Sequence, residues 1–122
     1  MQGLLNEVVL DLSISARLLI VDDDAFLRTT LRQQLLDEGF SEVFEASTLL
    51  EVFIKLPDAK PDLILLDVCL LDGSGLEICR KLRERGFTEP IIMLAGQNLE
   101  NDIVAGLEAG ANDYIVKPMR ME

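Results

Sequence analysis

The chain contains no histidine and no tryptophan, and only two of its 122 residues are cysteines, Cys69 and Cys79. Zinc sites usually need histidine or closely spaced cysteine pairs, and neither occurs here. Acid–base catalysis by histidine is excluded for the same reason. We therefore interpret both cysteines as small apolar packing residues.

Basic residues are also scarce, with 11 against 22 acidic residues and a net charge of −11. Such a chain repels nucleic acid phosphates, so we expect no direct nucleic acid binding by this domain. No apolar run approaches the roughly 20 residues that span a bilayer. The segment 1–16 carries Glu7 and Asp11 and lacks a basic start, which makes it a poor signal peptide. We expect a cytoplasmic protein that does not associate with membranes.

Apolar residues make up 49% of the chain, enough for one domain with a real core. Strand and helix patterns alternate along it. We predict strands at 17–22, 42–46, 63–67, 91–95 and 112–117, and helices at 24–38, 48–56, 75–85 and 98–109. This pattern predicts an α/β fold, a flavodoxin-like doubly wound parallel five-stranded sheet of order 2-1-3-4-5.

Local signals refine these elements. Asp24 can cap the first helix and Gly39 can end it, and Pro57 is expected to stop the second helix. The turn at 72–75 is expected to hold Gly73 or Gly75 at positive φ. The predicted inward residues are Phe26, Leu27, Leu31, Leu35 and Leu36 in the first helix, and Ile103, Val104 and Leu107 in the last.

The pattern predicts a domain at 17–122 that lacks a last helix after its fifth strand, preceded by an extension at 1–16. Without that helix, the last strand should have an uncovered apolar face. The extension could cover this face, swap with a second copy or stay disordered. An exposed apolar patch would favour a homodimer through the side of the last strand.

Charged residues follow three of the apolar runs directly: LLIV precedes Asp22-Asp23-Asp24, LILL precedes Asp67, and YIV precedes Lys117-Pro118. In the predicted strand order, Asp22, Asp23 and Asp67 lie at the switch point between the first and third strands. Two carboxylates about 4 Å apart repel by roughly 4 kcal/mol at an effective dielectric near 20. Such a cluster binds a cation or takes up a proton, and hard oxygen ligands at a partly open site favour Mg²⁺, or Mn²⁺.

A carboxylate beside a metal can act as a nucleophile toward a phosphoryl group, and Asp67 is placed for this role. Lys117 would supply a fixed positive charge for the phosphoryl oxygens. The alternatives are a solvated turn for Asp23, a helix cap for Asp24 and an exposed lysine at 117. Pro118 is a candidate for a cis peptide bond that aims Lys117 inward.

From Arg17 to Pro118 the chain resembles a response-regulator receiver domain of two-component signalling. Three segments carry the resemblance, in the order and spacing of the family: LLIVDDD, PDLILLDVCLLDGSGLE and GLEAGANDYIVKP. The first resembles the family's acidic loop, the second its phosphoacceptor strand and loop, and the third its last helix, strand and lysine.

The resemblance implies that Asp67 accepts a phosphoryl group from a sensor histidine kinase or a phosphotransfer protein. It also implies that Asp22, Asp23, Asp67 and the backbone carbonyl of Cys69 hold Mg²⁺, and that Lys117 pairs with the acyl phosphate. Tyr114 would be the aromatic residue that turns inward on activation. The domain would not be an enzyme in its own right, beyond its own phosphorylation and slow dephosphorylation.

Two positions depart from the family pattern. Ala95 stands where a serine or threonine normally hydrogen-bonds the phosphoryl group, and Leu71 replaces a usual proline. Loss of a charge-assisted hydrogen bond of roughly 1.5–3 kcal/mol would weaken the coupling of phosphorylation to conformation by about tenfold or more. We therefore expect weakened switching.

Two other functions remain open. A degenerate receiver could serve as a constitutive protein–protein interaction module, which Ala95 and the missing helix would favour. A phosphatase with an aspartyl nucleophile would need a second acid two residues after the nucleophile, and Cys69 stands there instead.

Overall fold

The computed structural model describes residues 12–96 and 100–117, apart from the side chains of residues 100 and 102. Five parallel strands form the main sheet, in the order β2-β1-β3-β6-β7. They are β1 (Arg17–Val21), β2 (Glu42–Ala46), β3 (Leu63–Asp67), β6 (Ile91–Ala95) and β7 (Asp113–Val116). This is the predicted strand order, and it confirms the flavodoxin-like fold.

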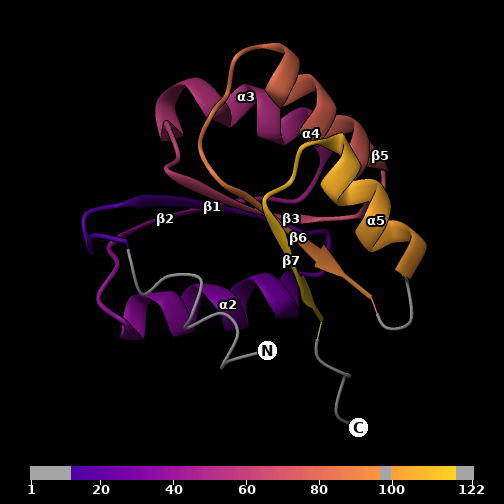
Figure 1. Cartoon of the computed structure of the whole chain (residues 1–122). Helices are drawn as coiled ribbons and strands as arrows, with labels where there is room; N and C mark the ends of the chain where they lie inside the picture. Colours follow the sequence, from indigo (N-terminus) through magenta and orange to yellow (C-terminus); the bar gives the residue numbers. More distant parts are fainter. Residues whose placement is uncertain (1–11, 97–99, 118–122) are drawn as a thin grey trace, which may run out of the picture.

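Helices cover both faces of the sheet, as Figure 1 shows. The helices are α2 (Ala25–Asp37), α3 (Leu49–Ala59), α4 (Gly75–Glu84) and α5 (Glu100–Ala109). α2 lies on one face, where its Leu27, Leu31 and Leu35 pack with alternate strand residues. The other three helices pack on the opposite face. β1, β3 and β6 are therefore buried on both sides, which explains their unbroken apolar runs.

Most helix ends follow the predicted signals. The Asp24 side chain accepts hydrogen bonds from the backbone of Phe26 and Leu27, so this residue caps α2. Gly39 follows the end of α2 at φ +108°, a conformation that glycine adopts without a steric penalty.

The expected stop before Pro57 is wrong, because α3 continues to Ala59 with Pro57 inside it. Proline removes a single hydrogen bond here, in the last turn. The end of the helix is stabilised from outside: Ala59 is buried, and the guanidinium of Arg17 donates to the carbonyls of Asp58 and Ala59.

In α2 and α5, some of the residues predicted to face inward are exposed. Phe26 is 70% exposed, and Val104 and Leu107 of α5 are 53% and 43% exposed. α5 instead approaches the sheet through Gly106 and Ala109, with Ile103 partly buried. Small residues allow a close approach, so the larger neighbours on this helix are left on its outer side.

The last strand was expected to have an uncovered apolar face, but Ile115 does not show one. Ile115 of β7 is fully buried, as is Leu94 of the neighbouring β6. Val116, whose side chain points the other way, is 38% exposed. The homodimer through this side stays a prediction, and so does the separate extension at 1–16, since residues 1–11 lie outside the described part.

A small antiparallel hairpin, β4 (Cys69–Leu70) and β5 (Gly73–Ser74), follows β3 and was not predicted. The expected positive φ at Gly73 or Gly75 is also wrong. Gly75 is needed for space, because a Cβ atom there would lie 1.9 Å from the carbonyl oxygen of Asp67. The hairpin thus folds back tightly onto the end of β3.

Candidate functional site: an acidic cluster with one lysine

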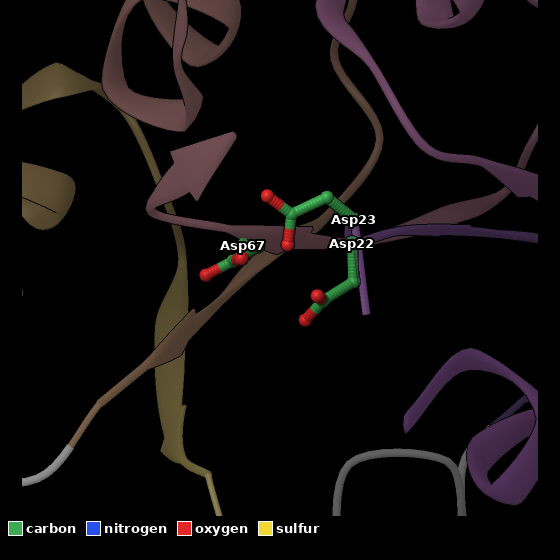
Figure 2. Close-up of side chains that lie close together, drawn as sticks. All are labelled: Asp22, Asp23 and Asp67. Carbon is green, nitrogen blue, oxygen red and sulfur yellow. The ribbon is translucent and has the colours of Figure 1, made fainter. Parts of the chain in front are cut away.

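Three carboxylates meet at the carboxyl ends of β1 and β3 (Figure 2). Asp22 and Asp23 follow β1, and Asp67 is the last residue of β3. One oxygen from each lies within 4.8 Å of the others. The two strands are adjacent and in parallel register, with Val21 opposite Leu66, so their next residues emerge side by side. This confirms the juxtaposition expected from the strand order.

Asp22 and Asp67 are almost completely buried, and Asp23 is half-buried. Asp22 Oδ1 accepts a hydrogen bond of 2.8 Å from the backbone N–H of Asp24. Asp67 Oδ1 accepts one of 3.3 Å from the backbone N–H of Cys69. In Asp22 and Asp67, Oδ1 is therefore held by the loop that follows the strand, which leaves Oδ2 for the other groups of the site.

Lys117 joins the cluster from the end of β7. Its Nζ atom lies 2.9 Å from Asp22 Oδ2 and 3.0 Å from Asp67 Oδ2. The backbone N–H of Lys117 donates to the carbonyl of Ala95, which continues the β6–β7 pairing to this point. Sequence alone left open whether Lys117 was an exposed surface lysine, and the structure excludes that alternative.

The charges of the cluster shift its proton affinities. Burial, and then the negative charge of Asp22, raise the pKa of Asp67 to about 6, although Lys117 opposes the shift. For Lys117, burial works against the charged ammonium group. The hydrogen bond to Asp22 and the charge of Asp67 outweigh it, and the pKa of the lysine is raised. A lysine with a raised pKa stays charged at neutral pH.

The donor set fits a divalent cation with oxygen ligands. Asp22 Oδ2 is fully buried, and the Lys117 ammonium group lies 2.9 Å from it. A buried carboxylate oxygen needs a donor or a positive charge beside it, and a divalent cation would add to the charge that Lys117 provides. Asp22, Asp23 and Asp67 would supply the side-chain ligands.

Arg28 is a residue of the site that sequence reasoning missed. Its guanidinium donates to the backbone carbonyl of Asp22 at 2.6 Å and to Glu45 at 3.0 Å. It thereby joins the acidic loop after β1 to the end of β2. An arginine one turn into a helix that follows an acidic loop is the signal that could have identified it.

The two positions expected to act in switching lie on the adjacent strands β6 and β7. Ala95, the last residue of β6, is completely buried. Tyr114 of β7 is partly buried and packs against the core on the face of α3, α4 and α5. Pro118, the candidate for a cis peptide bond, lies outside the described residues.

Comparison with known proteins decides the family. The family model of the response regulator receiver domain matches residues 18–122. The chain belongs to the response-regulator receiver domains. This receiver domain is 40% identical over 109 residues to response regulator MprA of Mycobacterium tuberculosis, a match that covers 89% of this chain and 47% of that protein. The chain thus spans about half the length of the curated relatives it matches.

Solved structures agree with this assignment. A two-component response regulator from Clostridium difficile matches with a TM-score of 0.79 and 31% identity, over 87% of this chain and 86% of that one. The receiver domain of NtrX from Brucella abortus matches with a TM-score of 0.77 and 28% identity, over 84% and 87% of the two chains. Among the described residues of this receiver domain, no helix is both long and apolar enough to cross a membrane.

Proposed function

We propose that this receiver domain accepts a phosphoryl group on Asp67 in a magnesium-dependent reaction. The observation that carries the proposal is the position of the Asp67 carboxylate, 3.0 Å from the Lys117 ammonium and within 4.8 Å of the ligand atoms of Asp22 and Asp23. One nucleophile, one fixed cation and an oxygen-rich cation site are the groups that phosphoryl transfer to a carboxylate requires.

The donor is a phosphohistidine on a sensor kinase or a phosphotransfer protein. An Asp67 carboxylate oxygen attacks phosphorus, the P–N bond to the histidine breaks, and the imidazole nitrogen leaves with the bonding electron pair. Asp67 becomes an acyl phosphate. The chain is the acceptor in this step, so it is not an enzyme acting on a separate substrate.

Each residue of the cluster has a role in this step. Asp22, Asp23, Asp67 and the backbone carbonyl of Cys69 would hold Mg²⁺ or Mn²⁺, which supplies charge neutralisation between the carboxylate and the incoming phosphoryl oxygens. Lys117 keeps its positive charge at neutral pH because its pKa is raised, and it pairs with a phosphoryl oxygen. At pH 7 the Asp67 carboxyl, with a pKa of about 6, is mostly ionised and therefore nucleophilic.

The expected weak switching belongs to the same proposal. Ala95 ends β6 with a buried methyl group, which donates no hydrogen bond to a phosphoryl oxygen. In this proposal the domain takes up phosphate readily and changes conformation little. A constitutive interaction module is the second candidate, and the same observation at Ala95 favours it. Tyr114 as the moving aromatic, a cytoplasmic location and the lack of direct nucleic acid binding remain predictions.

Incubation with Mg²⁺ and a small-molecule phosphodonor tests the proposal. We expect mass spectrometry to show one added phosphoryl group in the wild type and none in Asp67→Asn. A beryllofluoride complex should form with the same dependence on Mg²⁺ and Asp67. No added group in the wild type, or an equal amount in Asp67→Asn, would contradict phosphoryl acceptance on Asp67. The interaction module would then be the favoured hypothesis.

A further inference from the structure

Asp72 lies at the tip of the β4–β5 hairpin and connects the hairpin to the start of α3. Its Oδ1 accepts a hydrogen bond of 2.8 Å from the backbone N–H of Leu49, and its Oδ2 accepts one of 3.3 Å from that of Leu50. These are the first two residues of α3, and they lie 23 and 22 positions from Asp72 in the chain.

The contact is a helix cap supplied from outside the helix. The first N–H groups of any helix have no partner within it. The side chain of Thr48, the N-cap of α3, accepts from the backbone N–H of Glu51, the third helical residue. Asp72 accepts from the other two, and its negative charge interacts favourably with the positive end of the helix. These hydrogen bonds, led by that of Leu49, also lower the pKa of Asp72.

Leu70 of β4 is buried in the core, but the tip beyond it has little burial of its own. Leu71, the residue before Asp72, is 84% exposed and contributes almost no burial. The hairpin pairs only two residues from each strand, and so short a ladder is marginal on its own. Gly73 adds a close packing contact, because a Cβ atom there would lie 2.9 Å from Leu49 Cδ1. Asp72 and Gly73 therefore both contact the first residues of α3.

The base of the hairpin is the functional site. Cys69 begins β4 and pairs with Ser74, while its N–H donates to the Asp67 carboxylate. Gly75 donates to the carbonyl of Val68 at 2.7 Å, which closes the hairpin onto the end of β3. A hairpin fixed at its tip holds the Cys69 peptide unit in one orientation beside the acidic cluster.

We propose that Asp72 is a positioning residue, which anchors the hairpin to α3 and thereby fixes the backbone of Cys69 at the cation site. The proposal rests on the proposed function, since it assigns the Cys69 carbonyl to a bound cation. Asp72 contacts neither the cation nor the phosphoryl group. It acts on Cys69 through the backbone of the two intervening residues, Leu70 and Leu71.

The experiment compares Asp72→Ala, Asp72→Asn and Thr48→Ala. Thr48→Ala is the matched control, because it also removes an N-terminal cap of α3 but leaves the hairpin untouched. Two quantities are measured for each full-length variant: the dissociation constant of Mg²⁺ alone, by calorimetric titration, and the hydrogen-exchange rates of the Cys69 and Leu70 amides without metal, by NMR. Far-ultraviolet circular dichroism checks that each variant is folded.

For Asp72→Ala we expect about 3- to 10-fold weaker Mg²⁺ binding, less than the loss on removing a direct partner of a ligand. Its Cys69 and Leu70 amides should exchange faster. Asp72→Asn keeps one acceptor oxygen and should fall between the wild type and Asp72→Ala, which also preserves the test if the alanine variant does not fold. Thr48→Ala should leave both quantities unchanged.

Equal Mg²⁺ affinity and equal exchange in the wild type and the Asp72 variants would overturn the positioning role. Equal changes in Thr48→Ala and Asp72→Ala would overturn it too, because they would trace the effect to α3 stability alone. Failure of the wild type to bind Mg²⁺ would instead count against the proposed function. The exchange rates, measured without metal, would still decide whether Asp72 anchors the hairpin.

Discussion

β3 and β6 are neighbours in the sheet, with Asp67 of one paired opposite Leu94 of the other. β3 ends in a buried carboxylate whose charge is balanced by Lys117. β6 ends one residue further along, at Ala95, in a buried methyl group. In the proposed function, Asp67 at one strand end takes up the phosphoryl group, and Ala95 at the adjacent end has no side-chain group that could hydrogen-bond it. We therefore propose that phosphoryl uptake and the conformational response to it are separable, because different strands supply the residues for each.

The largest expected effect concerns Lys117, which pairs with Asp67 at the end of β3. Lys117→Ala should slow phosphorylation by a small-molecule donor by about 10²-fold, the usual cost of removing one fixed charge from a transition state. The rate is measured by mass spectrometry over time. Lys55→Ala is the control, because Lys55 is another lysine in an ion pair, with Glu51 on α3. An equal loss in both variants would mean that general charge, not the position of Lys117, sets the rate.

Asp22→Asn should weaken Mg²⁺ binding by about 10- to 100-fold, because it removes a charged ligand from a buried site. Calorimetric titration measures the change. Asp113→Asn is the matched control: Asp113 is an exposed acid at the start of β7, and it also accepts a local hydrogen bond that asparagine can keep. If Asp22→Asn binds Mg²⁺ like the control, the acidic cluster is not the cation site.

Asp67→Asn should stabilise the fold at neutral pH while abolishing phosphorylation. The pKa of Asp67 is about 6 in the folded chain against 3.8 for an ordinary aspartate, so the folded state binds more protons between these values. Stability from this group is then full below about pH 4 and falls as pH rises to about 6. At pH 7 the variant should be more stable than wild type by about 2 kcal/mol.

Urea unfolding in a metal chelator, at pH 4 and pH 7, measures this difference. The advantage of Asp67→Asn should vanish at pH 4, and Asp113→Asn should show no such pH dependence. An advantage of equal size at both pH values would mean that ionisation of Asp67 is not its cause.

The smallest effect concerns the β6 end. Ala95→Ser adds the missing hydroxyl, and it should strengthen beryllofluoride binding by about tenfold through one charge-assisted hydrogen bond. NMR shifts at α5 and β7 on adding the ligand should also become larger. A gain of affinity without larger shifts would show that the hydroxyl contributes to phosphoryl binding alone. An unchanged affinity would show that the missing hydroxyl at Ala95 does not weaken phosphoryl binding.

Much of the site was predictable because it depends on strand order. Asp22, Asp23, Asp67 and Lys117 each follow an apolar run, and the order of parallel strands brings these ends together. Asp72 and Arg28 were missed for the opposite reason. Asp72 accepts from the backbone N–H groups of Leu49 and Leu50, and Arg28 reaches the acidic loop through the backbone carbonyl of Asp22. Backbone groups leave no pattern in a sequence. The role of Gly75 was misread because its close neighbour, the Asp67 carbonyl, is also backbone.

The amino-acid sequence alone was enough to predict the strand order and the charged residues at the strand ends, since the alternation of apolar runs and amphipathic helices admits few parallel folds. It placed the ends of β1 and β7 one residue too late, at 22 and 117 rather than at Val21 and Val116. It also determined that Ala95 lacks a hydroxyl. Tertiary structure decided that Asp22 and Asp67 share one lysine, that α3 continues past Pro57 and that a hairpin returns from Asp67 to α3. These features depend on contacts between segments that are distant in the chain, and the geometry of such contacts exists only once the sheet has formed.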